Sequence, residues 1–418
     1  MLRLPGLGRL LRWRWLVLQI PFLVVALLLI YDGFTGPQQA PAIWRPSALR
    51  ALSRAGDRRP AAGGQPVLHG LSLTIPRTLA KRLSHRGRRF PKALRNKWVA
   101  IATLFAFFFL YEWLDLWASP WLTAWTIIVY FAASFALEAV FAESPFCKYV
   151  CPLGMFNYVY STVSPLQIGA HSYEVCLHCK GKECVNGSYR ETPLIVVDQI
   201  GVNGAPDLTH TNDQHGTLGC GTELFVPSIK SNMDCMFCLD CARACPHDNV
   251  GLMARAPGAE LLRPDAFPRR WDLAFLLISF SFMGLLNAFG MVPPVYDLMR
   301  SLADALNLPA LGFSDLAIEG IVLFIILGVG MILLPAALSL AAAAFARWLT
   351  RTTKRDSLRA ALTPFAPAFI PLGIGFWTAH YGFHFLIGVL TIIPAFQDFL
   401  LRHGIALLGE PNWSLQRR

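Results

Sequence analysis

Charged side chains are scarce in this chain. Only 15% of its 418 residues are Asp, Glu, Lys or Arg, whereas 54% are hydrophobic, and the mean hydropathy is +0.44. This composition excludes an ordinary soluble globular protein, in which about a quarter of the residues are charged. The chain also lacks a glycine-rich phosphate loop, a Ser-His-Asp set and a flavin signature. The sequence therefore shows no independent enzymatic active site.

Cysteine is absent from most of the chain as well. All 10 cysteines lie between Cys147 and Cys245, so none is scattered as an ordinary core residue. The run from Cys235 to Pro246 has the form Cys-x2-Cys-x2-Cys-x3-Cys-Pro. In bacterial ferredoxins with this pattern, three thiolates hold one 4Fe–4S cube and the fourth usually binds a second cube. The run therefore predicts an iron–sulfur site.

Zinc and disulfides account for this run less well. A single zinc ion is typically bound by two separated Cys-x2-Cys pairs, and four thiolates packed this tightly fit poorly around one tetrahedral ion. Disulfides between such near neighbours would be strained as a set. The pattern favours iron–sulfur ligation over both alternatives.

Four further cysteines supply ligands for a second cube. By the crossed ligation of two-cluster ferredoxins, one cube takes a first set of thiolates and the other cube takes a second set. The first set is Cys176, Cys179, Cys184 and Cys245, and the second is Cys220, Cys235, Cys238 and Cys241. Because Cys220 follows a long insertion, an exchange of Cys184 and Cys220 between the sets stays open.

The remaining pair, Cys147 and Cys151, continues into Pro152-Leu-Gly154 just after an apolar segment. A Cys-x3-Cys-Pro-Leu-Gly sequence at the end of a membrane helix, followed by the ferredoxin run, resembles the membrane polyferredoxins of the NapH/NosR type. The resemblance covers about residues 98–292. It implies a ferredoxin-like module on a transmembrane bundle, passing electrons between the quinone pool and a redox partner. The chain departs from the family in its first cluster motif, in the insertion Val185–Gly219 and in its longer C-terminal part.

About six segments are long and apolar enough to cross a bilayer, which takes roughly 20 residues. They are Trp15–Phe34, Trp98–Trp117, Trp121–Ala142, Trp271–Val292, Ile321–Ala343 and Phe369–Ile393. Tryptophans at several ends fit an interfacial aromatic belt. Pro335 and Pro371 are expected to kink their helices. The sequence predicts a mainly α, polytopic transmembrane helix bundle with an inserted ferredoxin-like two-cluster module.

Basic residues predict the orientation of the bundle. Fourteen Lys and Arg lie between Thr35 and Lys97, against the single acid Asp57. The positive-inside rule places this segment, and with it the cysteine-rich loop, on the cytoplasmic side of the inner membrane. The basic N-terminus conflicts with a single first span, so that segment crosses, lies in the interface or forms a hairpin. The basic segment also favours anionic lipid. Nucleic-acid binding is not expected, because the segment lacks aromatic interleaving and any recognisable reading motif.

Ionisable residues inside spans indicate function because they are costly in a bilayer. His380 and His384 share one face of the last span, with Tyr381 beside them. One helix cannot supply both axial ligands of a haem, so the pair favours hydrogen bonding to a quinone carbonyl; hydrogen bonds between helices are the alternative. Glu138 is either a proton relay or a carboxylate that reaches water. His178 and His247 are expected at the surface or behind the ligands.

Together these features divide the chain into five parts. These are an N-terminal membrane segment (1–34), a basic cytoplasmic linker (35–97), a transmembrane hairpin (98–142), a 4Fe–4S module (143–265) and a C-terminal transmembrane region (266–418). We expect an electron carrier between quinone and an unidentified protein partner. The alternatives are a membrane metal reductase or oxidase-maturation factor, in which Cys147 and Cys151 meet the metal, and a redox-sensing adaptor subunit.

Overall fold

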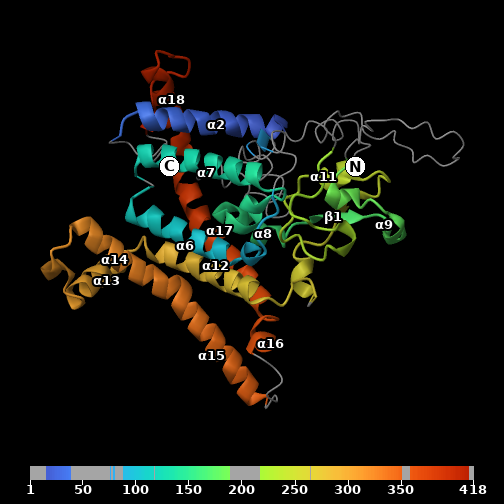
Figure 1. The fold of residues 1–418 in the computed structure, drawn as a ribbon. Coiled ribbons are helices and arrows are strands. Elements are labelled where there is room, and N and C mark those ends of the chain that lie inside the picture. The colour runs from blue at the N-terminus through green and yellow to red at the C-terminus, as the bar shows by residue number, and fades with distance from the viewer. Residues whose placement is uncertain are drawn as a thin grey trace, which may run out of the picture.

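The computed structural model describes residues 16–38, 76, 79–80, 88–116, 118–188, 217–263, 265–350 and 358–413. The fold is mainly helical, with one small sheet on one side of the helices (Figure 1). Eight helices surround the apolar core or extend from it. They are α2 (Leu16–Thr35), α6 (Trp98–Trp113), α7 (Pro120–Val140), α12 (Trp271–Phe289), α14 (Asp315–Gly328), α15 (Leu334–Leu349), α17 (Phe369–Gly388) and α18 (Ile392–Arg402). Two shorter helices complete this part, α13 (Pro294–Ala305) and α16 (Leu358–Leu362).

Residues 143–265, which we call the cysteine module, hold the small sheet and the remaining short helices. Strand β1 (Leu166–Ala170) pairs antiparallel with β2 (Val250–Ala254), in the register Ile168 opposite Leu252. The helices are α8 (Pro152–Ser161), α9 (Tyr173–His178), α10 (Glu183–Asn186) and α11 (Asp240–Ala244). Because β1 precedes the first cysteine motif and β2 follows the second, their pairing closes the module around the thiols.

Hydrogen bonds at both ends show that α6 and α12 run in the same direction. At the end beside the cysteine module, the Lys97 N–H donates to Asp272 Oδ2 at 2.8 Å. At the other end, which we call the far end, the Asn287 amide donates to Glu112 Oε1 at 3.2 Å. Both helices therefore begin at the module end of the bundle.

Helices α7 and α14 run back toward the cysteine module. The Trp113 indole, at the far end of α6, donates to the Leu316 carbonyl at the start of α14, at 2.8 Å. At the other end of α7, the Arg88 N–H donates to the Val140 carbonyl at 2.9 Å, beside the module. The acidic helix α13 thus lies at the far end, between the end of α12 and the start of α14.

Helix α2 packs antiparallel to α7 and so begins at the module end. A Cβ on Gly33 would lie 2.7 Å from Ala124 Cβ, so the two backbones need glycine there to approach this closely. The described ends of the basic segment consequently lie at opposite ends of the bundle, Thr35 at the far end and Arg88 at the module end. Most of residues 35–97 lies outside the described residues, so its assignment as a cytoplasmic linker stays a prediction.

A cluster of aromatic rings forms the centre of the bundle. Trp377 is fully buried, and its indole N–H donates to the Phe280 carbonyl at 2.9 Å. Its ring stacks on Phe108 at 5.0 Å and meets Phe156 edge-on at 4.7 Å. The three rings come from α17, α6 and α8, so the cluster joins the C-terminal helices to the helix that enters the module.

Four helical segments among the described residues are long and apolar enough to cross a membrane. They are Pro120–Val140, Trp271–Phe289, Asp315–Leu349 and Leu358–Leu386. The apolar helices Ile20–Thr35 and Trp98–Trp113 are shorter. The predicted span Trp98–Trp117 was too long, because Asp115 adopts a left-handed φ of 45° that ends the helical turn. That α2 and α6 also cross the membrane stays a prediction.

The two prolines expected to kink their helices behave differently. A π-helical turn, Val329–Leu333, lies just before Pro335, whose ring would clash with the carbonyl of a regular preceding turn. Pro371 instead lies in the first turn of α17, where its missing N–H would have no partner inside the helix. The expectation of a kink at Pro371 was therefore wrong.

Candidate iron–sulfur site

The first group of thiols gathers around Cys184 on α10. Cys184 interacts electrostatically with Cys245, Cys176 and Cys179, and burial, followed by these neighbours, raises the pKa of its thiol to about 11. Cys176 lies on α9 and Cys179 follows its end, while Cys245 ends α11. We call these four residues the outer group. The first sequence motif and the last cysteine of the second motif thus meet in space.

The second group gathers around Cys241 on α11. Cys241 interacts electrostatically with Cys238, Cys220 and Cys235. Burial raises the pKa of Cys235 to about 12. We call these four residues the inner group, because Cys235 and Cys241 are buried toward the bundle. The structure places Cys184 in the outer group and Cys220 in the inner one. That a cube occupies each group stays a prediction.

Backbone amides point at the sulfurs of both groups. Cys179 accepts from Lys182 and Glu183, Cys184 from Val226, and Cys235 from Phe237. The Leu224 N–H donates to Cys220 Sγ at 3.3 Å. Each such bond favours the thiolate over the thiol, which metal ligation requires.

The turns between the ligands are held in the left-handed region. Phe237 has a φ of 58° and Leu239 a φ of 59°, and neither residue is a glycine. Such a conformation costs about 1–2 kcal/mol per residue. A strained backbone of this kind is consistent with a loop that orients Cys235, Cys238 and Cys241 toward one point.

Side chains in the described part of the chain do not come close enough together to hold a single metal ion. Among the described residues, no three or more His, Cys, Asp or Glu side chains are arranged so that they could hold one metal ion. The histidines near the motifs do not change this, because His178 and His247 are exposed. His210 and His215 lie outside the described residues. The thiols therefore form two loose groups of four rather than one compact ligand set.

A buried ion pair joins the bundle to the inner group. Lys97, just before α6, is 2% exposed, and its Nζ forms an ion pair with Asp234, which directly precedes Cys235. Burial raises the pKa of Asp234, but Lys97 outweighs this and holds that pKa below its ordinary value. The same Lys97 Nζ donates to the Lys148 carbonyl at 2.7 Å. Sequence analysis missed this pair, although a lysine at the start of an apolar segment was a visible signal.

Cys147 and Cys151 lie between the bundle and the inner group. Cys151 is 2% exposed and caps α8, where its Sγ accepts the Gly154 N–H at 3.3 Å. Burial raises the pKa of the Cys151 thiol to about 12. Buried Tyr158 interacts electrostatically with Cys147, Cys151 and Cys235, so its ring lies between the pair and the inner group. The pair is therefore close to the inner group without belonging to it.

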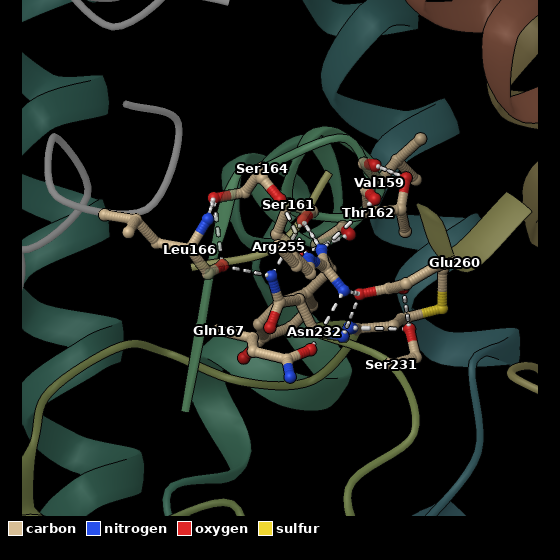
Figure 2. Close-up of polar contacts among 12 residues, drawn as sticks. Val159, Ser161, Thr162, Ser164, Leu166, Gln167, Ser231, Asn232, Arg255 and Glu260 are labelled. Carbon is tan, nitrogen blue, oxygen red and sulfur yellow. Dashed lines mark hydrogen bonds and ion pairs between the residues drawn. The ribbon is translucent and has the colours of Figure 1, made fainter. Parts of the chain in front are cut away.

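Within the cysteine module, a buried polar network fixes the chain after β2 to the end of α8 (Figure 2). Arg255, just after β2, donates to the carbonyls of Ser161, Thr162 and Ser164 at 3.1, 3.2 and 2.8 Å. Its guanidinium also pairs with Glu260, which is 1% exposed. Arg255 thereby satisfies carbonyls that the end of α8 leaves without helical partners.

The histidine pair lies toward the far end of the bundle. The rings of His380 and His384 are 4.8 Å apart, and His384 Nε2 lies 3.1 Å from Met291 Sδ, just beyond the end of α12. Tyr381 stacks on Trp377 at 5.4 Å. Because α12 rises about 28 Å from the module end to Met291, the pair is remote from the thiol groups. Glu138 is 1% exposed, so the alternative of a carboxylate that reaches water was wrong.

Comparisons with known proteins identify no relative. No protein-family model matches the chain. No curated protein and no solved structure matches it either. The function must therefore be argued from the geometry of the chain itself.

Proposed function

We propose that the protein is an integral membrane iron–sulfur electron carrier, which moves single electrons between quinone and a redox partner protein. The observation that carries the proposal is the gathering of eight cysteines into an outer and an inner group of four. The outer group joins Cys176, Cys179 and Cys184 to Cys245 from the end of the second motif, as crossed ligation requires. The other two cysteines, Cys147 and Cys151, lie near the inner group, and the Tyr158 ring interacts with both of them and with Cys235.

Cubes suit the two groups better than single ions do. In a 4Fe–4S cube each thiolate binds a different iron, so the four sulfurs stay farther apart than four ligands on one ion. Once bound, a cube accepts and donates one electron at a time.

The residues of the chain supply the surroundings of these carriers. Backbone amides of Phe237 and Leu224 stabilise the negative charge on the inner sulfurs. Arg255 holds the chain after β2 against the end of α8, and α8 carries Phe156 into contact with Trp377. Met236, next to Cys235, packs in the core of the bundle, so the inner group adjoins that core.

We place the quinone at His380 and His384, where a histidine can hydrogen-bond a carbonyl and Tyr381 supplies an aromatic wall. Both histidines are half-buried, and Phe383 beside them is 60% exposed, so a molecule in the lipid can reach them. The stacked rings of Tyr381 and Trp377 continue to Phe156. The pair is then the end of a relay that crosses the bundle rather than a direct neighbour of the cubes.

We also propose that about six helices cross the inner membrane, with the cysteine module in the cytoplasm. The alternation of helix ends between the module end and the far end supports this arrangement, since basic Arg269 and Arg347 lie toward the module and acidic Asp297 lies away. A cytoplasmic module also keeps its thiols reduced and available for metal.

Labelling in intact cells tests the orientation. Asn186 and Asp304 are both exposed, so Asn186→Cys and Asp304→Cys each add an accessible thiol. A maleimide that cannot cross the membrane should label the Asp304→Cys variant above the parent protein and leave the Asn186→Cys variant at the parent level. The reverse result would overturn the proposed topology.

Anaerobic redox kinetics test the function. Dithionite-reduced protein in detergent should be reoxidised by a soluble quinone, with recovery of the iron–sulfur absorbance. The rate should rise with quinone concentration and saturate, because quinone binds before the electron moves. Reoxidation that is no faster with quinone than with buffer would exclude quinone as the redox partner and favour a sensing or maturation role.

A further inference from the structure

The two thiol groups have opposite electrostatic surroundings. This difference bears on the direction of the electron step, which the proposed function leaves open. The inference rests on the proposed function, since it concerns cubes bound by these groups. The difference lies in the charged side chains next to each group.

Two lysines from the bundle approach the inner group. Lys97 is held against Asp234, next to Cys235, and its Nζ lies 5.0 Å from the centre of the Tyr158 ring. Lys148, inside the Cys-x3-Cys sequence, donates from its Nζ to the Thr222 carbonyl at 2.5 Å. The Thr222 hydroxyl in turn lies 3.4 Å from Cys220 Sγ. Lys97 thus lies near Cys235, and Lys148 lies near Cys220.

Each acid near the inner group is paired with a basic side chain. Glu260, which interacts with Cys235, pairs with Arg255. Asp240, beside Cys241, pairs with Arg243. Asp234 has Lys97 as its partner and Arg270 near it. Arg270 itself pairs with Asp272, so Lys148 is the cation beside the inner group that forms no ion pair among the described residues. It lies in a partly buried setting, where charges are screened less than in water.

The outer group faces a carboxylate instead. The Cys179 thiol donates to Glu183 Oε2 at 3.3 Å, and Glu183 forms no ion pair with any Lys or Arg in the part of the chain that is described. Lys180 and Lys182 are nearby but exposed, so solvent and salt screen their charges. Backbone amides reach sulfurs in both groups and so do not distinguish them.

We infer that Lys97 and Lys148 raise the reduction potential of the inner cube above that of the outer cube, so that electrons run from the outer group toward the bundle. Reduction adds one negative charge to a cube, which buried cations stabilise and a carboxylate opposes. In the step itself the outer cube loses one electron and the inner cube gains it. A soluble one-electron carrier protein supplies each electron at the outer group, and two such electrons, together with two protons from water, convert one quinone to quinol at the bundle.

The test is a redox titration of the loaded, full-length protein, followed by electron paramagnetic resonance. Lys97→Met and Lys148→Met should lower the same one of the two potentials. We expect the ratio of reduced to oxidised cube to fall at least tenfold at a fixed potential, which equals 59 mV for one electron. Asp234→Asn should raise that same potential. Glu183→Gln should raise the other.

Potential shifts of opposite sign in the lysine and carboxylate variants distinguish an effect of charge from a packing defect. Lys230→Met is the matched control, because Lys230 forms an exposed ion pair with Asp265, and it should move neither potential. If Lys97→Met does not fold, Lys148→Met and Glu183→Gln still test the inference. If both cubes are bound but neither potential changes in these variants, or both change together, this inference is wrong while the proposed function stands. Absence of iron and sulfide from the wild-type protein would overturn the proposed function instead.

Discussion

The backbone N–H of Cys220 donates a hydrogen bond of 3.0 Å to the carbonyl oxygen of Cys184. These residues belong to different thiol groups and flank the insertion Val185–Gly219. Ser188 and Thr217 form an antiparallel bridge beside them, with hydrogen bonds of 2.8 and 2.6 Å. The bridge closes the insertion at its base, so the two cysteines are held together independently of the rest of the insertion.

We therefore predict that residues 190–215 can be replaced by an Asn-Gly turn, which favours a tight hairpin. Iron and sulfide content should be unchanged. Gly219→Ala is the contrasting variant, because its Cβ would lie 2.2 Å from the Val185 carbonyl oxygen and force the bridge apart. It should lower the iron content. A shortened protein that loses half its iron would show that the insertion contributes to ligation.

Arg255→Met should destabilise the cysteine module. The change leaves Glu260 as a buried carboxylate without its arginine and removes the Arg255 hydrogen bonds from three carbonyls at the end of α8, of which Ser161 keeps its bonds from Ser164 and Asn232. Breaking a buried pair from one side costs about 3–5 kcal/mol. Thermal unfolding in detergent should show a lower midpoint, partly restored in Arg255→Met, Glu260→Met. Equal midpoints for the wild type and Arg255→Met would make the network dispensable.

Cys151→Ser should retain both cubes, because eight other cysteines fill the two groups. The serine hydroxyl can accept the Gly154 N–H as the Cys151 sulfur does, so α8 should keep its start. We expect slower electron exchange with quinone and an unchanged iron content. Loss of half the iron would mean that the ligands are misassigned and that Cys184 or Cys220 is the free thiol.

A His380→Ala, His384→Ala double variant should keep its cluster signals but exchange electrons with quinone much more slowly. The pair lies near the exposed Phe383, toward the end of the bundle away from the cysteines. Stopped-flow reoxidation by quinone measures the rate. Unchanged kinetics would leave the pair with a packing role, such as the contact of His384 with Met291.

Much of the architecture could be predicted from the sequence. Apolar length alone located the four helical segments that are long enough to cross a membrane, since bilayer thickness fixes how many residues a span needs. The helix ends were less predictable, because local dihedral angles decide them, as at Asp115. The longest predicted C-terminal segment divides into α17 and α18 for the same reason, with a short 3-10 turn, Val389–Thr391, between them.

The composition of the site could be predicted, but its electrostatics could not. Cysteine spacing specifies which residues can share a cube, since covalent chemistry limits the choice. The pairing of Lys97 with Asp234 joins residues far apart in sequence, so the lysine at the start of an apolar segment was a visible signal but its partner could not be predicted. The remoteness of His380 and His384 from the thiols was equally hidden, because it depends on how α17 crosses α12.

The most direct measurement of the central claim is the iron, acid-labile sulfide and zinc content of anaerobically purified protein. Two cubes, each bound by four thiolates, predict about eight iron and eight sulfide per chain, with no stoichiometric zinc. Cys238→Ala should then lose about half of both. Stoichiometric zinc with no sulfide would contradict the account.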